Sequence, residues 1–128
     1  MTREDITKLY HTYIACLNAQ DWDGLHQFVA DDVEYNGQII GLAGYQAMLG
    51  ADFKAIPDLY FKITRLACDP PMIACGLSFD CTPIGQLFGL AVNGTPVQFS
   101  ENVFYEISRG KIHKVWSVID KAAIAAQL

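Results

Sequence analysis

VQFSENVFYEISRGKIHKVWSVID, residues 97–120, gives the clearest indication of fold class in this chain. Two runs rich in β-branched and aromatic residues lie on either side of Arg109-Gly110, a pattern typical of a β-hairpin with those two residues at its turn. The second run ends at Asp120, where an apolar strand is expected to stop. The same stretch therefore predicts a pair of long strands and a candidate carboxylate.

Strand alternation predicts which side chains share a face of this hairpin. With a regular register, Val103 pairs with Trp116 and Glu101 pairs with Val118, so Asp120 lies diagonally from Glu101. If this face lines a dry pocket, desolvation and like charge raise the pKa of one carboxyl, which suits a general base acting beside a carbonyl. A register shift of one residue would invert the face. The predicted face consists of Phe99, Glu101, Val103, Tyr105, Trp116, Val118 and Asp120.

The rest of the chain divides into helices followed by strands. Helical spacing of apolar residues predicts helices over 4–19, 21–30 and 41–55, and a short strand over 33–35. Period-two patterns predict strands over 59–68, 72–82, 97–107 and 112–119. The glycine-rich segment 85–94 has too few polar residues for an ordinary solvent loop, so we expect it to pack over something. This order predicts an α+β fold, with three N-terminal helices on one face of a curved antiparallel sheet.

Composition limits the classes of function. With 128 residues, 52% of them hydrophobic and 18% charged, the chain is expected to form one globular domain over 1–128. A net charge of −5 and the lack of a basic cluster argue against a nucleic-acid partner. No run is long enough to cross a bilayer, and the N-terminus lacks the apolar core of a signal peptide. We therefore expect a cytoplasmic protein with no membrane partner.

Cysteine and histidine spacing gives no metal motif. Buried, reduced thiols are the favoured interpretation of the cysteines, while a disulfide or a zinc site would need distant partners that spacing cannot identify. We expect no metal. The residues concerned are Cys16, Cys68, Cys75 and Cys81, with His11, His26 and His113 scattered singly.

An ordered series of short motifs runs through almost the whole chain. It consists of YxxxLNAxDxDxL at 13–25, ADDV at 30–33, IPDL at 56–59, TxxGxxxG at 82–89, GxxV at 94–97, GKIxxxWxxxD at 110–120 and the closing Gln127-Leu128. The first two motifs resemble the opening of the nuclear-transport-factor-like superfamily, which includes the ketosteroid isomerases. The complete series resembles the SnoaL-like polyketide cyclase group within it.

This resemblance implies a cone-shaped fold with a deep apolar pocket between sheet and helices, assembled as a dimer or higher oligomer. Members of the group close a polyketide ester by an intramolecular aldol reaction. An aspartate at the end of the last strand acts there as acid and base, and Asp120 matches its position. Without the resemblance, a C-terminal cap or a surface carboxylate at the start of residues 121–123 would be the favoured interpretation of Asp120.

Three aromatic residues are further candidates. Tyr13 matches the helix-one tyrosine that, in ketosteroid isomerases, donates a hydrogen bond to the developing oxyanion. Tyr35 stands where many cyclases carry a pocket histidine, and Trp116 is expected to form a pocket wall. Each could equally be a core residue, and Glu101 could equally be an exposed strand residue.

Several positions depart from the related enzymes. The aspartate base of ketosteroid isomerases falls near Gly37, and their second oxyanion donor falls at Val103, so steroid isomerase activity is not expected. Two polar motifs of the cyclases, Glu-His-Trp and Thr-His-Thr-Gly, are replaced by residues 114–116 and 82–85. These changes leave a more apolar pocket.

Three hypotheses follow. The first is an enzyme of the cyclase, isomerase or lyase type that performs cofactor-free acid/base chemistry on a small apolar carbonyl compound. Its predicted catalytic residues are Asp120, Tyr13 and Glu101, and its predicted substrate-binding residues are Trp116, Tyr35, Val118, Val103 and Phe99. The second is a non-catalytic module that binds a small hydrophobic ligand in the same pocket. The third concerns assembly as a homodimer or higher oligomer through an outer sheet patch of Phe104, Val115 and Ile119.

Overall fold

The computed structural model describes residues 1–128, and its first helix shows how the sequence fixes local structure. Helix α1 (Arg3–Asn18) begins with a capping box: the Thr2 hydroxyl accepts the Asp5 N–H at 3.1 Å, and the Asp5 carboxylate accepts the Thr2 N–H at 2.9 Å. Its apolar face is buried and includes Tyr10, Tyr13 and Leu17. The cap therefore fixes the start of a helix that carries two tyrosines into the core.

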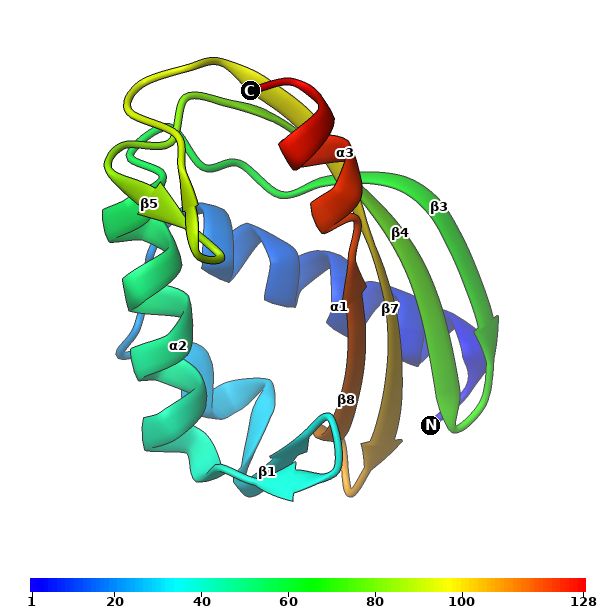
Figure 1. Cartoon of the computed structure of the whole chain (residues 1–128). Coiled ribbons are helices and arrows are strands. Elements are labelled where there is room, and N and C mark those ends of the chain that lie inside the picture. The colour runs from blue at the N-terminus through cyan, green and yellow to red at the C-terminus, as the bar shows by residue number, and fades with distance from the viewer.

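A curved six-stranded sheet forms the other half of the fold, which confirms the predicted α+β class (Figure 1). Its strand order is β2-β1-β8-β7-β4-β3, antiparallel except where β1 runs parallel to β8. The strands are β1 (Val29–Tyr35), β2 (Gln38–Ile39), β3 (Lys62–Asp69), β4 (Met72–Cys81), β7 (Val97–Ser108) and β8 (Lys111–Ile119). Helix α2 (Gly41–Ala55) stands opposite β7 and β8 in Figure 1, with α1 crossing between them.

The helix predicted over 21–30 is wrong. The Asp21 carboxylate accepts the Gly24 N–H at 3.1 Å and closes a turn, and only one 3₁₀ turn, η1 (Leu25–Gln27), follows. The Phe28 carbonyl then accepts the Ile112 N–H at 2.7 Å, which draws the chain into the sheet. The apolar residues of this segment are therefore buried or partly buried in a turn and at the start of β1, not in a helix.

The glycine-rich segment packs as predicted. It forms a small hairpin of β5 (Gln86–Leu87) and β6 (Leu90–Ala91), with Leu87 and Val92 buried. Phe88 stands at its tip, and the ring lies 5.1 Å from the Lys121 ammonium in a cation–π contact. Lys121 begins the short C-terminal helix α3 (Lys121–Ala126), so the hairpin and the chain end meet at this point.

The β7–β8 hairpin starts in the predicted register and then departs from it. Arg109 and Gly110 both have positive φ, and Ile107 lies opposite Ile112. Glu106, however, lies opposite Lys114, so His113 is an extra residue on β8, a β-bulge. Beyond the bulge each β8 side chain points to the face opposite the predicted one. Val115, Ser117 and Ile119 therefore face inward, while Trp116 and Val118 face outward.

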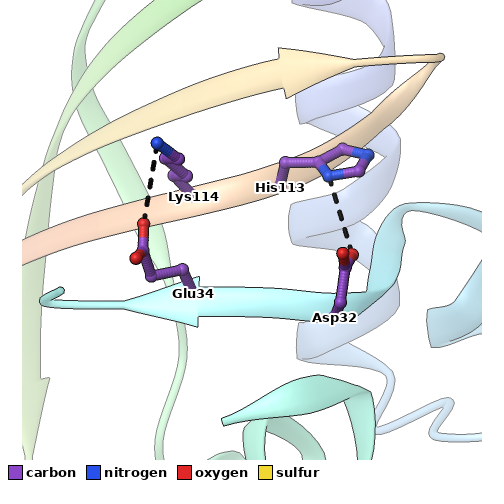
Figure 2. A network of polar contacts seen from close by, with 4 residues as sticks. All are labelled: Asp32, Glu34, His113 and Lys114. Atoms are coloured by element: carbon purple, nitrogen blue, oxygen red, sulfur yellow. Dashed lines mark ion pairs between the residues drawn. The ribbon is translucent and has the colours of Figure 1, made fainter. Parts of the chain in front are cut away.

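Two ion pairs join β1 and β8 at and beside this bulge (Figure 2). His113 Nδ1 lies 3.7 Å from Asp32 Oδ1, and Lys114 Nζ lies 3.8 Å from Glu34 Oε2. Both pairs are partly open to solvent, where such contacts contribute little stability. The bulge is therefore held by the backbone register of the sheet rather than by these side chains.

The outer sheet face has a different composition from the predicted one. Phe104 is exposed as expected, but Val115 is only 2% exposed and Ile119 lines the interior. Trp116 at 37% and Val118 at 71% exposure take their places beside Phe104. The inversion at His113 explains the exchange, and the outer face still carries a contiguous apolar patch, defined here as Phe104, Trp116 and Val118.

The four cysteines form no disulfide; Cys16, Cys75 and Cys81 are buried and Cys68 is half-buried. None of the helices combines the length and the apolar character required to span a membrane.

Candidate functional site

A cavity of about 60 Å³ is lined by residues of the sheet and of helices α1 and α2. Asp52 and Glu101 are the only charged side chains among its nineteen lining residues, and no lysine, arginine or histidine is present. The other lining residues are aromatic or aliphatic. The volume exceeds the minimum that a water molecule needs. The arrangement is a small apolar cavity holding two carboxyl groups.

Glu101 reaches this cavity from β7. Its neighbours on the same face, Phe99 and Val103, also line the wall, as strand alternation requires. Ser117 Oγ donates a hydrogen bond to Glu101 Oε2. Burial raises the pKa of Glu101, the hydrogen bond from Ser117 opposes that rise, and the nearby charge of Asp52 adds to it. Glu101 is therefore a stronger base than an exposed glutamate.

Asp52 reaches the cavity from α2. Tyr45, Met48, Leu49 and Ile56 line the wall from the same helix or its C-terminal cap, at the spacing of one helical face. Burial raises the pKa of Asp52 to about 6. Asp52 can therefore gain or lose a proton close to neutral pH.

Tyrosine hydroxyls form two pairs, each with at least one member in the cavity wall. The Tyr13 and Tyr45 hydroxyl oxygens lie 2.6 Å apart, and the Tyr10 hydroxyl donates to the Tyr105 hydroxyl at 3.2 Å. Burial raises the pKa of all four phenols, so they stay neutral and keep a proton to donate. Tyr13, Tyr45 and Tyr105 line the cavity. They can supply hydrogen bonds to an oxygen that gains negative charge there.

Of the eight site residues predicted from the sequence, the cavity wall contains five. These are Glu101, Tyr13, Tyr35, Val103 and Phe99.

Asp120, Trp116 and Val118 lie outside the cavity, so their predicted position on the face of Glu101 is wrong. The reason is the extra residue at His113, which inverts β8 before it reaches them. Asp120 is exposed, and its Oδ1 accepts the Ala123 N–H at 3.1 Å as the N-cap of α3. Asp120 is thus an exposed carboxylate at the start of the last segment, as the alternative interpretation has it, but it caps the N-terminus of a helix rather than a C-terminus.

Three polar residues of the site escaped the sequence reasoning. Asp52 is a lone acid on the inward face of α2, three residues after Leu49, and helical spacing could have indicated it. Tyr45 lies on the apolar face of the helix predicted over 41–55, but helical spacing gives no sign that its hydroxyl pairs with that of Tyr13. Ser117 could be found only by knowing the bulge. No three His, Cys, Asp or Glu side chains gather so as to bind a metal ion.

Comparisons with known proteins agree with this architecture. The sequence profile described as SnoaL-like polyketide cyclase matches residues 7–128. A crystal structure of a SnoaL-like polyketide cyclase from Agrobacterium tumefaciens strain C58 is 46% identical, with a TM-score of 0.94, and the match covers 99% of this chain and 98% of that one. No curated protein matches the chain significantly.

More distant structures share the fold. TsrD from Streptomyces laurentii has a TM-score of 0.88 at 16% identity, over 99% of this chain and 96% of its own. IdmH from Streptomyces antibioticus has a TM-score of 0.82 at 15% identity, over 94% and 96%. The profile match over nearly the whole length, with the close Agrobacterium relative, shows that this chain belongs to the SnoaL-like polyketide cyclase family.

Proposed function

We propose that this protein catalyses proton transfer on a small, neutral, apolar carbonyl compound, with Glu101 as the general base. The observation that carries the proposal is the Glu101 carboxyl, buried in an apolar cavity and hydrogen-bonded to Ser117 with no cation facing it. A carboxylate in such surroundings binds a proton more strongly than in water. It is therefore suited to remove a proton from a carbon next to a carbonyl group.

The proposed reaction uses Glu101 twice. Glu101 takes the α-proton and leaves an enolate, whose oxygen accepts a hydrogen bond from the Tyr13–Tyr45 pair. In a cyclisation, the enolate carbon attacks a second carbonyl of the same molecule and forms a carbon–carbon bond. The resulting alkoxide then receives the proton held by Glu101. In an isomerisation, Glu101 returns that proton to a different carbon.

Asp52 would set the charge of the cavity. Below pH 6 it is largely protonated, since burial raises its pKa to about 6, and above that pH it adds a second negative charge. A second charge strengthens Glu101 as a base and disfavours an anionic substrate. The proposed substrate is therefore neutral.

The test compares two carboxylates. Wild type, Glu101→Gln and Asp120→Asn are incubated in D₂O with a panel of cyclic and aryl ketones, and deuterium incorporation at the α-carbon is followed by NMR. We expect Glu101→Gln to lose about 10²- to 10⁴-fold in rate and Asp120→Asn to stay near wild type, because asparagine also caps a helix. Wild-type exchange by Glu101→Gln, or its loss in Asp120→Asn, would contradict the assignment.

A second candidate function is binding without catalysis. The observation in its favour is that seventeen of the nineteen lining residues are hydrophobic. Native mass spectrometry of the purified protein with the same ketones would detect retained ligands. Binding without any α-exchange above the buffer rate would favour this function over the enzyme.

A further inference from the structure

Asn36 extends the β1–β8 ladder beyond the point where β1 ends. Its backbone N–H donates to the Val115 carbonyl at 2.9 Å, and the chain then turns away at Asn36-Gly37, both with positive φ. The Asn36 side chain continues the pattern: Oδ1 accepts the Ser117 N–H at 2.8 Å, and Nδ2 donates to the Ser117 carbonyl at 3.3 Å. The amide side chain thus pairs with Ser117 where a further strand residue would otherwise stand.

The Ser117 backbone is held by Asn36, and the Ser117 side chain points toward the cavity. It lies between Val115 and Ile119, both of which line the wall, so its side chain faces inward. Its Cα partner on β7 is Val103, which puts Glu101 on the diagonal. The Ser117 hydroxyl donates to Glu101 Oε2, and it is the only hydrogen bond that the Glu101 side chain makes with the protein. Asn36, Ser117 and Glu101 therefore form one chain of contacts from the surface to the cavity.

We propose that Ser117 holds the Glu101 carboxylate in a single orientation, and that Asn36 is a positioning residue that acts through Ser117. Its catalytic consequence rests on the function proposed above, whereas the positioning itself does not.

The Ser117 hydroxyl is the one hydrogen-bond donor to the Glu101 carboxylate that a substitution can remove. None of the groups that face it is a cation, so removal of the hydroxyl leaves the carboxylate with no donor, and the Glu101 pKa rises further. Asp52 is the one facing group that titrates near neutral pH. The facing titratable groups are Asp52 and Tyr45 from α2, Tyr13 from α1, Tyr35 from β1, Cys75 from β4 and Tyr105 from β7.

The experiment measures the Glu101 pKa directly, by NMR titration of ¹³C-labelled glutamate carboxyls, with Glu101→Gln to assign the signal. We expect Ser117→Ala to raise that pKa by about one unit. Ser117→Thr keeps the hydroxyl on a residue that suits a strand, so it should titrate like wild type. Asn36→Gly, which tolerates the positive φ at this position, should raise the pKa by a smaller amount.

A double mutant separates positioning from a general structural effect. If Asn36 acts through Ser117, Asn36→Gly has no further effect on the Glu101 pKa in the Ser117→Ala background. Equal effects in both backgrounds would overturn the role of Asn36, and an unchanged pKa in Ser117→Ala would overturn the role of Ser117. Should Asn36→Gly fail to fold, the Ser117→Ala and Ser117→Thr pair still decides the role of Ser117.

These outcomes are independent of the proposed function, because the titration needs no substrate. If the pKa moves as expected but Glu101→Gln keeps wild-type α-exchange, the catalytic proposal fails while the positioning stands. If both hold, the pH at which exchange reaches half its maximum should move to higher pH in Ser117→Ala by the same amount as the Glu101 pKa.

Discussion

Asp52 and Glu101 occupy the same cavity, but their surroundings differ. Glu101 accepts a hydrogen bond from Ser117, whereas no protein group donates to the Asp52 side chain, so nothing offsets the cost of its burial. The charge of Asp52 also raises the pKa of Glu101. At the scale of single residues, the site therefore has one carboxylate held by a hydrogen bond, Glu101, and one without a donor, Asp52.

This difference predicts a pH-dependent gain in stability for Asp52→Asn. The pKa of Asp52 is raised from 3.8 to about 6 in the folded protein, so folding favours the protonated form. That contribution is fully present below pH 3.8 and is lost as the pH rises through 6. Asp52→Asn, which cannot ionise, should be more stable than wild type by on the order of 2 kcal/mol at pH 7.5 and nearly equal at pH 4. Urea denaturation at both pH values measures this, and a difference independent of pH would refute the burial argument.

At the scale of elements, β8 shows where sequence reasoning succeeds and where it stops. The turn at Arg109-Gly110 and the extent of both strands follow from residue types, and the structure has them. The bulge does not follow. Residues 115–119 read VWSVI and offer apolar side chains to both faces, so hydrophobic pattern alone could not choose between the two alternations.

The bulge itself can be tested by a deletion. Removal of His113 would restore regular alternation and turn Trp116 and Val118 toward the cavity, which has no room for an indole. We expect the deletion to destabilise the fold by more than ~3 kcal/mol. His113→Ala should cost less than ~1 kcal/mol, because it keeps the backbone and loses only a partly exposed ion pair with Asp32. Thermal unfolding by circular dichroism compares them, and equal melting temperatures would show that the bulge does not set the faces.

Helical spacing was similarly reliable for α1 and α2 but not for 21–30. There Trp22, Leu25 and Phe28 have helical spacing, yet the turn closed by Asp21 and Gly24 redirects the chain before a helix can form. In the candidate site, too, residues that depend on one element could be predicted, and residues that depend on tertiary arrangement could not. Glu101, Tyr13 and Tyr35 were found from strands or from resemblance, whereas Asp52 and Ser117 depend on how separate elements meet.

At the scale of the whole molecule, the sheet has one face that encloses a cavity and one that faces solvent. Residues of the inner face, α1, α2 and the tip of the β5–β6 hairpin line a cavity of about 60 Å³. Sites for drug-sized ligands are several times larger. A small molecule therefore fits the cavity as it stands, whereas a multi-ring polyketide requires its walls to move apart.

The outer face predicts self-association. We propose that a second copy of the chain covers Phe104, Trp116 and Val118, because these large apolar side chains are exposed side by side and two-fold homodimers commonly bury such a patch. Val118→Lys should shift the protein toward monomer in sedimentation velocity. Ile84→Lys is the matched control, since Ile84 is also exposed but lies in the loop before β5. Wild type that sediments as a strict monomer at high concentration would refute the prediction.

Phe88, at the tip of the β5–β6 hairpin, links the cavity wall to the C-terminal end of the chain. It is the most exposed of the lining residues, and its ring also contacts the Lys121 ammonium at the start of α3. A ligand that displaces the Phe88 ring as it enters breaks the contact between this ring and Lys121. Entry on that side thus disturbs the C-terminal end of the chain, which makes the last eight residues a reporter of occupancy for fluorescence or NMR labels.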